Sequence, residues 1–303
     1  MGWRRLGHVF APSGQFEWMR SHASVPYAEH IEGDLFRIYF SPRDGQNRSH
    51  LAWLELDITR PEKILRLADT PVLGPGAPGA FDDCGTMGSW SVVEDGKRHH
   101  FYIGWNIRQP MPFHVSIGLA VEPLAGGAVE RMQGPILDRT PIDPWFCSNP
   151  CVIREGGMWR MWYLGGRGWE ATASGPSASY DVRYAESEDG VTWRRDGRTA
   201  VGFSEPDEIA IARPCVVRTG EGYEMWFSYR GRGYPYRLGL ARSADGVTWS
   251  RDPDMGDLHP AQSGWDSEMI AYPFVFNHGA QRYLLYCGAG FGRTGFGLAV
   301  WEA

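Results

Sequence analysis

A short apolar strand pattern recurs five times along the chain at nearly even intervals, and this repeat constrains the fold more than any other feature. Its reference positions, each a proline or a tryptophan, are Pro26, Trp90, Pro150, Pro214 and Pro273, with spacings of 64, 60, 64 and 59 residues. An aromatic-rich stretch and then a stretch of small and apolar residues follow each of them. Each repeat therefore contains several strands.

Two near-identical turns mark the end of the third strand in two of the repeats: SEDGVTW, from Ser187 to Trp193, and SADGVTW, from Ser243 to Trp249. Asp-Gly supplies the positive φ angles of a tight turn, and the tryptophan then starts a fourth, outer strand. No segment shows an apolar period of 3.6 residues over helical length. We predict an all-β fold, a five-bladed β-propeller of four-stranded antiparallel blades, formed as one domain by residues 1–303. A two-sheet sandwich is the alternative, but it does not predict units of such even length.

The last repeat ends at Trp301 with its third strand, which leaves this repeat one strand short. The segment Trp3–Phe10 precedes the first repeat and has no blade of its own. We expect this N-terminal strand to pair with the last blade and to close the ring without a covalent bond, because closure removes open sheet edges.

Charge and composition limit the possible function classes. The net charge of −6 argues against a nucleic-acid partner, since nucleic-acid binders normally carry a basic excess. Neither a secretory signal nor a bilayer-spanning apolar stretch is visible, and the five cysteines form no CxxC pair, so we expect a cytoplasmic protein with reduced thiols and no membrane partner. No glycine-rich phosphate loop, dinucleotide fingerprint or HExxH motif occurs, and we expect neither a metal nor an organic cofactor.

Acidic residues recur just before the inner strands. Seven residues before the reference position stand Asp83, Asp143, Asp207 and Asp266 in repeats two to five, with Glu208 and Glu268 close to the last two. Repeat one has Met19 there instead, followed by Arg20 and His22. The start of an inner strand and the end of the next strand lie at the same face of an antiparallel blade. We therefore expect the acids to meet the arginines at the second-strand ends, which are Arg43, Arg108, Arg167, Arg230 and Arg293.

The predicted site is a rim of carboxylates and arginines, walled by tryptophans, at one end of the central channel. We predict catalytic roles for Asp83, Asp143, Glu208 and Glu268, because crowded like charges raise one another's pKa and let a carboxyl group act as a general acid. Substrate contacts are expected from His22, Arg43, Trp90, Arg213, Arg230 and Asp266. The plainer interpretation is that the acids cap turns or form ion pairs, that the tryptophans pack between blades, and that Arg213 pairs with Glu208. The small-residue stretch from Gly166 to Asp181 is interpreted as a long loop and a candidate lid.

Five repeats with acidic inner-strand starts and S-x-D-G-x-x-W turns resemble the five-bladed propeller glycosidases: arabinanases and β-xylosidases, invertases and levansucrases, and β-mannoside phosphorylases. The resemblance covers the whole chain at the level of architecture. It implies that the substrate is a small-molecule sugar or glycoside and that the reaction is hydrolysis or phosphorolysis of a glycosidic bond. Arabinanase-like members carry a base Asp in the first blade, an orienting Asp in a middle blade and an acid Glu in the following one. Asp143 and Glu208 match the latter two by blade and strand position.

The first-blade aspartate of that pattern is missing, because SHASVPY offers His22 and no carboxylate. Either Asp83 or Glu268 takes over its role, or an anion held by Arg20, Arg43 and His22 is the nucleophile, as phosphate is in the phosphorylases. Two other function classes stay open. One is a non-hydrolytic biosynthetic enzyme acting on a sugar or a natural-product intermediate, and the other is a non-catalytic carbohydrate-binding propeller.

Overall fold

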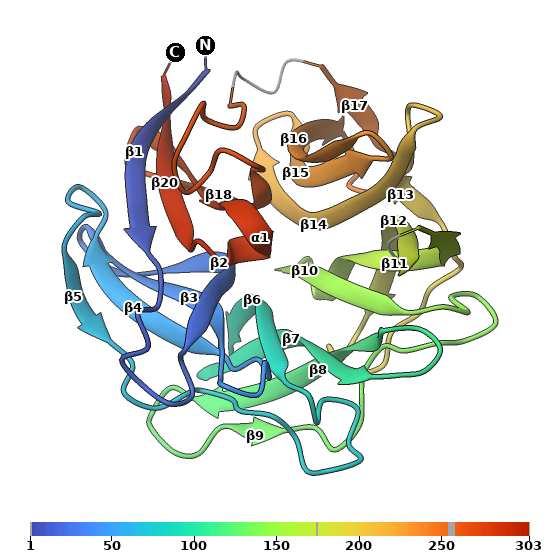
Figure 1. Cartoon of the computed structure of the whole chain (residues 1–303), viewed down its shortest axis with the longest axis horizontal. Helices are drawn as coiled ribbons and strands as arrows, with labels where there is room; N and C mark the ends of the chain where they lie inside the picture. Colours follow the sequence, from blue (N-terminus) through green and yellow to red (C-terminus); the bar gives the residue numbers. More distant parts are fainter. Residues whose placement is uncertain (1, 174, 254–257, 303) are drawn as a thin grey trace.

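The computed structural model of the chain describes residues 2–173, 175–253 and 258–302. Twisted antiparallel sheets stand around a central axis, and the chain visits them in sequence order (Figure 1). The strands nearest the axis are β2 (Ser21–Glu32), β6 (Thr86–Glu94), β10 (Cys147–Glu155), β14 (Glu208–Thr219) and β18 (Ala271–His278). Each contains one of the five reference residues, so the predicted inner strands are confirmed.

Three of the sheets have four strands. The first, in the order β2-β3-β4-β5, adds β3 (Leu35–Arg43), β4 (Ala52–Asp57) and β5 (Ile64–Leu67). The second, β6-β7-β8-β9, adds β7 (Lys97–Ile107), β8 (Phe113–Pro123) and β9 (Glu130–Arg131). The third, β1-β20-β19-β18, adds β1 (Gly2–Phe10), β19 (Gln281–Cys287) and β20 (Phe296–Glu302).

The remaining sheet has eight strands. Besides β10 and β14 it contains β11 (Met158–Thr172), β12 (Gly175–Ser187), β13 (Thr199–Val201), β15 (Gly222–Gly231), β16 (Tyr234–Ser243) and β17 (Ser250–Asp252). Its two antiparallel halves, β10 to β13 and β14 to β17, are joined by the parallel pairing of Tyr180 with Ala210.

The first strand of the chain closes the ring, as the sequence predicts. β1 pairs antiparallel with β20 from Gly2↔Glu302 to Phe10↔Phe296, and the two chain ends lie side by side (Figure 1). Trp3 anchors this pairing, because its buried ring makes edge contacts with Trp226 at 5.3 Å and Trp301 at 5.1 Å between centroids. The closure is therefore a packed aromatic contact as well as a hydrogen-bonded ladder.

The helical content of the described residues is one short element, α1 (Ala289–Gly292), which contains non-helical backbone. The two predicted Asp-Gly turns also form as expected. Gly190 and Gly246 have φ angles of 77° and 74°, and the backbone N–H groups that follow donate to the carboxylates of Asp189 and Asp245. The all-β prediction and its turn chemistry are thus confirmed.

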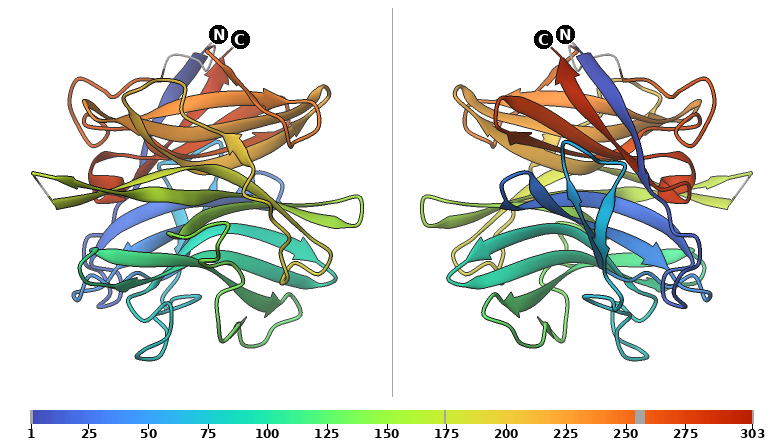
Figure 2. Two further views of the ribbon diagram at one scale, coloured as in Figure 1. Left: turned by 90° about the vertical axis from the view of Figure 1, so that its right-hand side faces the viewer. Right: turned by 90° about the vertical axis from the view of Figure 1, so that its left-hand side faces the viewer.

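The described residues of the stretch from Gly166 to Asp181 form two paired strands, Gly166–Thr172 of β11 and Gly175–Asp181 of β12, so the prediction of a loop over these residues is wrong. β11 and β12 extend their ladder outward as far as Thr172↔Gly175 and project from the side of the molecule (Figure 2). The small residues suggested a loop, but the two strands of the hairpin pair with each other at these positions. Trp169 of β11 packs outside the hairpin, against Phe113 of β8 and against Phe146, which precedes β10.

Four inner strands carry a left-handed residue directly before the reference proline. These residues are Val25, Asn149, Arg213 and Tyr272, with φ angles of 53°, 45°, 56° and 59°. The strand pairing shifts register at each of these points, so each is part of a β-bulge. A bulge bends its strand and redirects a side chain, which is why such features often border binding sites.

Candidate functional site: a pocket on the central axis

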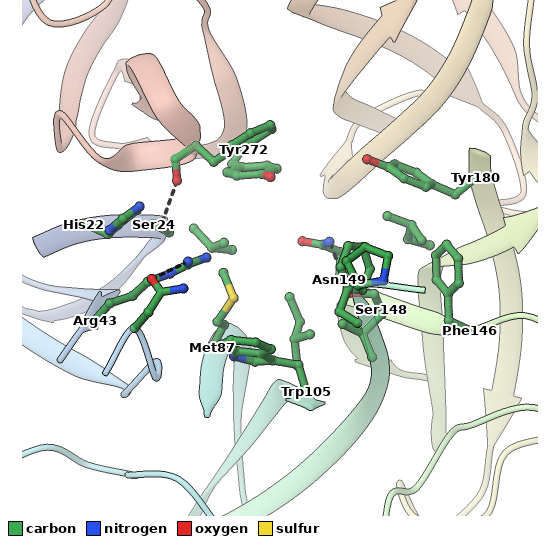
Figure 3. Close-up of a pocket in the computed structure, with 18 of the residues that line it drawn as sticks. His22, Ser24, Arg43, Met87, Trp105, Phe146, Ser148, Asn149, Tyr180 and Tyr272 are labelled. Atoms are coloured by element: carbon green, nitrogen blue, oxygen red, sulfur yellow. Dashed lines mark hydrogen bonds between the residues drawn. The ribbon is translucent and has the colours of Figure 1, made fainter. Parts of the chain in front are cut away.

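A pocket of about 440 Å³ opens where the inner strands begin. Its walls come from the starts of β2, β6, β10 and β18 and from the ends of β3 and β7 (Figure 3). Three of the four left-handed residues, Val25, Asn149 and Tyr272, line it. The bulges therefore bring side chains of three sheets into one cavity, at the end of the channel that the repeat pattern indicates.

One side of the pocket is basic. His22 and Arg43 lie there together, and Arg43 donates to the Asn47 side-chain oxygen at 2.9 Å (Figure 3). Burial, reinforced by the charges of Arg43 and Arg293, lowers the pKa of His22 to about 4. His22 is therefore neutral at pH 7. Burial also lowers the pKa of Arg43, but an arginine stays charged at any ordinary pH.

The opposite side is polar without charge. Ser148, Asn149 and Tyr180 face the cavity from β10 and β12 (Figure 3). The oxygen of the Asn149 side chain is buried and has no hydrogen-bond partner among the residues that the structure describes. Behind this wall the hydroxyl groups of Tyr180 and Tyr236 are hydrogen-bonded to each other. Hydroxyl and amide groups arranged in this way can exchange hydrogen bonds with the hydroxyl groups of a ligand.

Aromatic and aliphatic side chains form the remaining wall and the rim. Trp105, Phe113 and Phe146 line the cavity, and Ile107 and Phe291 at its edge are 70% and 47% exposed. Large apolar side chains left in water around a concave polar pocket are typical of a ligand-binding surface. The flat faces of the aromatic side chains among them can stack on the apolar face of a ligand ring.

The carboxylates predicted for this site lie elsewhere. None of the described residues that line the pocket is an Asp or a Glu. Asp143 and Glu208 are buried, and each is held by arginines: Arg183 and Arg195 contact Asp143, and Arg251 makes two bonds of 2.7 Å to Glu208. Asp266 is likewise buried and bonded to Arg5 at 2.8 Å. The expectation that these acids rim the channel is therefore wrong about their position.

The same ion pair recurs in four sheets or half-sheets, which explains the repeated acids. In each, a buried carboxylate just before or at the start of the inner strand binds an arginine that lies beyond the third strand of the same unit. The pairs are Asp82–Arg131, Asp143–Arg195, Glu208–Arg251 and Asp266–Arg5. A tyrosine hydroxyl donates to three of the acids, from Tyr102 to Asp82, Tyr163 to Asp143 and Tyr286 to Asp266. The plainer interpretation of these acids, as structural ion pairs, agrees with this arrangement.

The first sheet has Met19 in place of the acid, and its side chain is fully buried. Asp82, one residue before the predicted Asp83, is the buried acid of the second sheet. Asp83 itself is half-buried and accepts a bond from the Gly79 N–H at 3.0 Å. Glu268 is exposed, and it precedes Met269, which packs against the same apolar cluster as pocket residues Phe146 and Tyr272. Among the four predicted catalytic carboxylates, Glu268 alone is exposed beside residues that support the pocket.

Of the other residues predicted to contact the substrate, some line the pocket and some lie outside it. His22 and Arg43 line the pocket, whereas Trp90 packs against Phe274 at 5.0 Å. Arg230 stands behind the wall, with its guanidinium over the rings of Tyr180 and Tyr236.

Arg213 does not pair with Glu208, so that expectation is wrong. It is fully buried and donates to the Ser89 hydroxyl at 3.2 Å and to the Pro26 carbonyl at 3.3 Å. Its left-handed backbone turns the side chain across the ring, towards two other inner strands.

Sequence reasoning missed the uncharged half of the pocket. Asn149 and Tyr272 stand directly before reference prolines, and this position was a usable signal, since it recurs in every proline-containing inner strand. Tyr180 and Phe291 had no such signal, because the hairpin and α1 bring them to the pocket from outside the repeat pattern.

The described residues include neither a metal-binding cluster nor a membrane-spanning helix. They contain no group of three or more His, Cys, Asp or Glu side chains placed to hold a metal ion. They also include no helix with the length and apolar character needed to cross a membrane. All five cysteines are free thiols.

Two sequence relatives cover the whole chain. The "uncharacterized protein MT1551" of Mycobacterium tuberculosis (strain CDC 1551 / Oshkosh) is 46% identical over 305 residues, which is 100% of both proteins. The "uncharacterized protein Rv1502" of strain ATCC 25618 / H37Rv matches with the same identity and coverage. No family model matches the sequence.

Solved structures share the fold at low sequence identity. A glycosyl hydrolase from Bacteroides ovatus superposes with a TM-score of 0.72 at 16% identity, covering 99% of this protein and 93% of the other. The β-1,2-mannobiose phosphorylase from Listeria innocua, in complex with β-1,2-mannobiose, has a TM-score of 0.70 at 12% identity, covering 99% and 95%. A thermostable family-43 glycoside hydrolase has a TM-score of 0.68 at 16% identity, covering 92% and 88%. The protein therefore has the fold of the glycosidase-like propeller enzymes.

Proposed function

The chain belongs to the same family as the Mycobacterium tuberculosis proteins MT1551 and Rv1502, and we propose that it is a carbohydrate-active enzyme that binds a sugar in the pocket on the central axis. We further propose that β10–β13 and β14–β17 are separate blades of a five-bladed propeller, since one parallel residue pair joins them. The sheets would then form five equivalent units around the pocket.

The observation that carries the proposal is the pocket's lining. Hydroxyl and amide groups of Ser148, Asn149 and Tyr180 and the aromatic rings of Trp105 and Phe291 line the same cavity. A sugar ring presents the matching surface, with hydroxyl groups at its edge and C–H groups on its face. The structural neighbour bound to β-1,2-mannobiose supports the same class of ligand.

For the reaction we propose cleavage of a glycosidic bond, with Glu268 as the general acid. Its exposure and its place between the Asp266 ion pair and pocket residue Tyr272 support this choice over the buried acids. Asp143 and Glu208 are buried, are bound to arginines and do not line this pocket. Asp83, which is half-buried, is an alternative general acid.

A second candidate is supported by the same geometry. The described lining residues contain no carboxylate at all, whereas glycosidic cleavage normally needs two near the bond. This absence favours a sugar-binding protein without hydrolytic activity, or an enzyme that transforms its sugar by another reaction.

The test is a panel of aryl glycosides assayed with and without inorganic phosphate, using the wild-type protein and the Glu268→Gln variant. The enzyme proposal expects turnover of at least one glycoside and a loss of about 10²–10⁴-fold in Glu268→Gln, the usual effect of removing a general acid. The matched control is Glu221→Gln, an exposed residue at the β14–β15 hairpin, which should keep full activity. Full activity in Glu268→Gln would exclude this residue, and sugar binding without any turnover would favour the second candidate.

A further inference from the structure

Three buried or half-buried arginines differ from the others in having no carboxylate partner among the described residues. Among the described arginines that are buried or half-buried, all but Arg43, Arg213 and Arg230 have an Asp or Glu oxygen within 4.0 Å. A guanidinium withdrawn from water normally has such a counter-charge, because its desolvation is otherwise uncompensated. The three exceptions therefore need a common explanation.

All three arginines lie in the walls of the pocket or next to residues that form them. Arg43 lines the pocket itself. Arg213 belongs to the same ring of bulge residues as the lining residues Val25 and Asn149. Arg230 lies behind the wall, with its guanidinium carbon 5.9 Å from the ring centre of Tyr180, which lines the pocket.

None of the nearby ionisable groups considered below neutralises the positive charge of these arginines. The buried acids at the inner-strand starts are already bound to their own arginines, as in the pairs Glu208–Arg251 and Asp143–Arg195. Burial raises the pKa of Tyr272 above its ordinary range, so this hydroxyl stays neutral. His22 is neutral as well, because its pKa is about 4. The pocket therefore carries net positive charge.

Hydrogen bonds within the protein use only some of the N–H groups of these three arginines. Arg213 ties two inner strands together through Ser89 and Pro26, yet its Nε is buried and has no partner among the described residues. The Nε of Arg230 is buried without a partner in the same sense, and the bond that Arg230 donates to the Ala178 carbonyl is a long one of 3.4 Å. The side chain of Arg43 donates to Asn47 through one of its terminal nitrogens. Among the described residues only that nitrogen of Arg43 has a hydrogen-bond partner, so its other N–H groups remain for a ligand in the pocket.

We propose that the ligand of the central pocket carries an anionic oxygen group, a carboxylate or a phosphate, which Arg43 binds directly while Arg213 and Arg230 attract it from the channel and the wall. The guanidinium of Arg43 can present two N–H groups to such an oxyanion. The inference rests on the proposed function, since it names the class of sugar that the pocket takes: an acidic sugar or a phosphorylated one.

The test is isothermal titration calorimetry with matched ligands. The probes are glucose, galactose and mannose, each compared with its uronate and its 6-phosphate, and inorganic phosphate alone. We expect a uronate or a 6-phosphate to bind about tenfold or more tightly than its neutral parent, as one charge-assisted hydrogen bond predicts. In the wild-type protein this preference should weaken in high salt, because screening reduces charge attraction. The two acidic series distinguish a carboxylate from a phosphate.

Variants test whether Arg43 causes the preference for an acidic ligand. Arg43→Gln should remove the preference for the acidic ligand, and Arg43→Lys should restore part of it. Arg60→Gln is the matched control, an exposed arginine that does not line the pocket, and it should keep the preference. Circular dichroism and the melting temperature of each variant show that it is folded.

The outcomes separate the inference from the proposed function. Equal affinity for neutral and acidic sugars, or a preference that survives in folded Arg43→Gln, would overturn the inference and leave the sugar pocket standing. Binding of inorganic phosphate that depends on Arg43, with no sugar binding, would support the anion site and contradict the proposed function. The absence of binding by every probe would contradict both.

Discussion

A carboxylate near the start of an inner strand can hold the outer part of its sheet in place. Asp266 does so by accepting bonds from Tyr286 and from Arg5, a residue 261 positions away in the sequence. The acid can be predicted from the repeat, but its partner cannot. The arginine lies beyond the third strand of the sheet, and for Asp266 it comes from the opposite end of the chain. The sequence therefore predicted recurring acids and misplaced them at the pocket.

Glu208 tests this account at the residue scale. Glu208→Gln removes the charge that Arg251 and Ser204 bind, and breaking a buried ion pair in this way typically costs about 3–5 kcal/mol. We expect a loss of this size in the free energy of unfolding, measured in urea, and unchanged sugar binding by the folded variant. Glu205→Gln is the control, because this neighbour is exposed, and it should unfold like the wild type. A Glu208→Gln protein of normal stability with strongly reduced turnover would instead restore Glu208 as a catalytic acid.

Elements were predictable where local chemistry determines them. The prolines, the Asp-Gly turns and the aromatic runs identified the inner strands and the hairpins correctly. The Gly166–Asp181 segment was misassigned, because its small polar residues favour a loop in isolation. Backbone pairing with the opposite strand, together with the packing of Trp169 against Phe113 and Phe146, outweighs that preference.

The closing strand gives the prediction at the element scale. Trp3→Ala removes a buried ring between Trp226 and Trp301, and such a truncation typically costs about 3–5 kcal/mol. We expect a lower melting temperature and faster hydrogen exchange along β1 and β20. Arg4→Ala on the same strand removes only an exposed ion pair with Glu302 and should change little. Equal stability of the two variants would show that the buried ring of Trp3 does not contribute to closure.

For the whole molecule, the repeat indicated the end of the channel where the pocket lies, but not that the described residues lining it include no carboxylate. Inner-strand starts from several sheets converge there, as the antiparallel geometry requires, and His22 and Arg43 were correctly expected in that place. The uncharged and aromatic half of the pocket depends on bulges, on the β11–β12 hairpin and on α1. These features arise from packing between distant segments, so one sequence could not reveal them.

The central claim is that a sugar binds inside this pocket, and filling the pocket tests it most directly. Met87 lines the cavity from β6, and Val93 stands on the same strand at a 48% exposed position away from it. Saturation-transfer NMR with a panel of neutral and acidic mono- and disaccharides should detect a ligand for the wild type and for Val93→Trp. The account predicts that Met87→Trp, shown to be folded by its melting temperature, loses that signal. Undiminished sugar binding by folded Met87→Trp would contradict it.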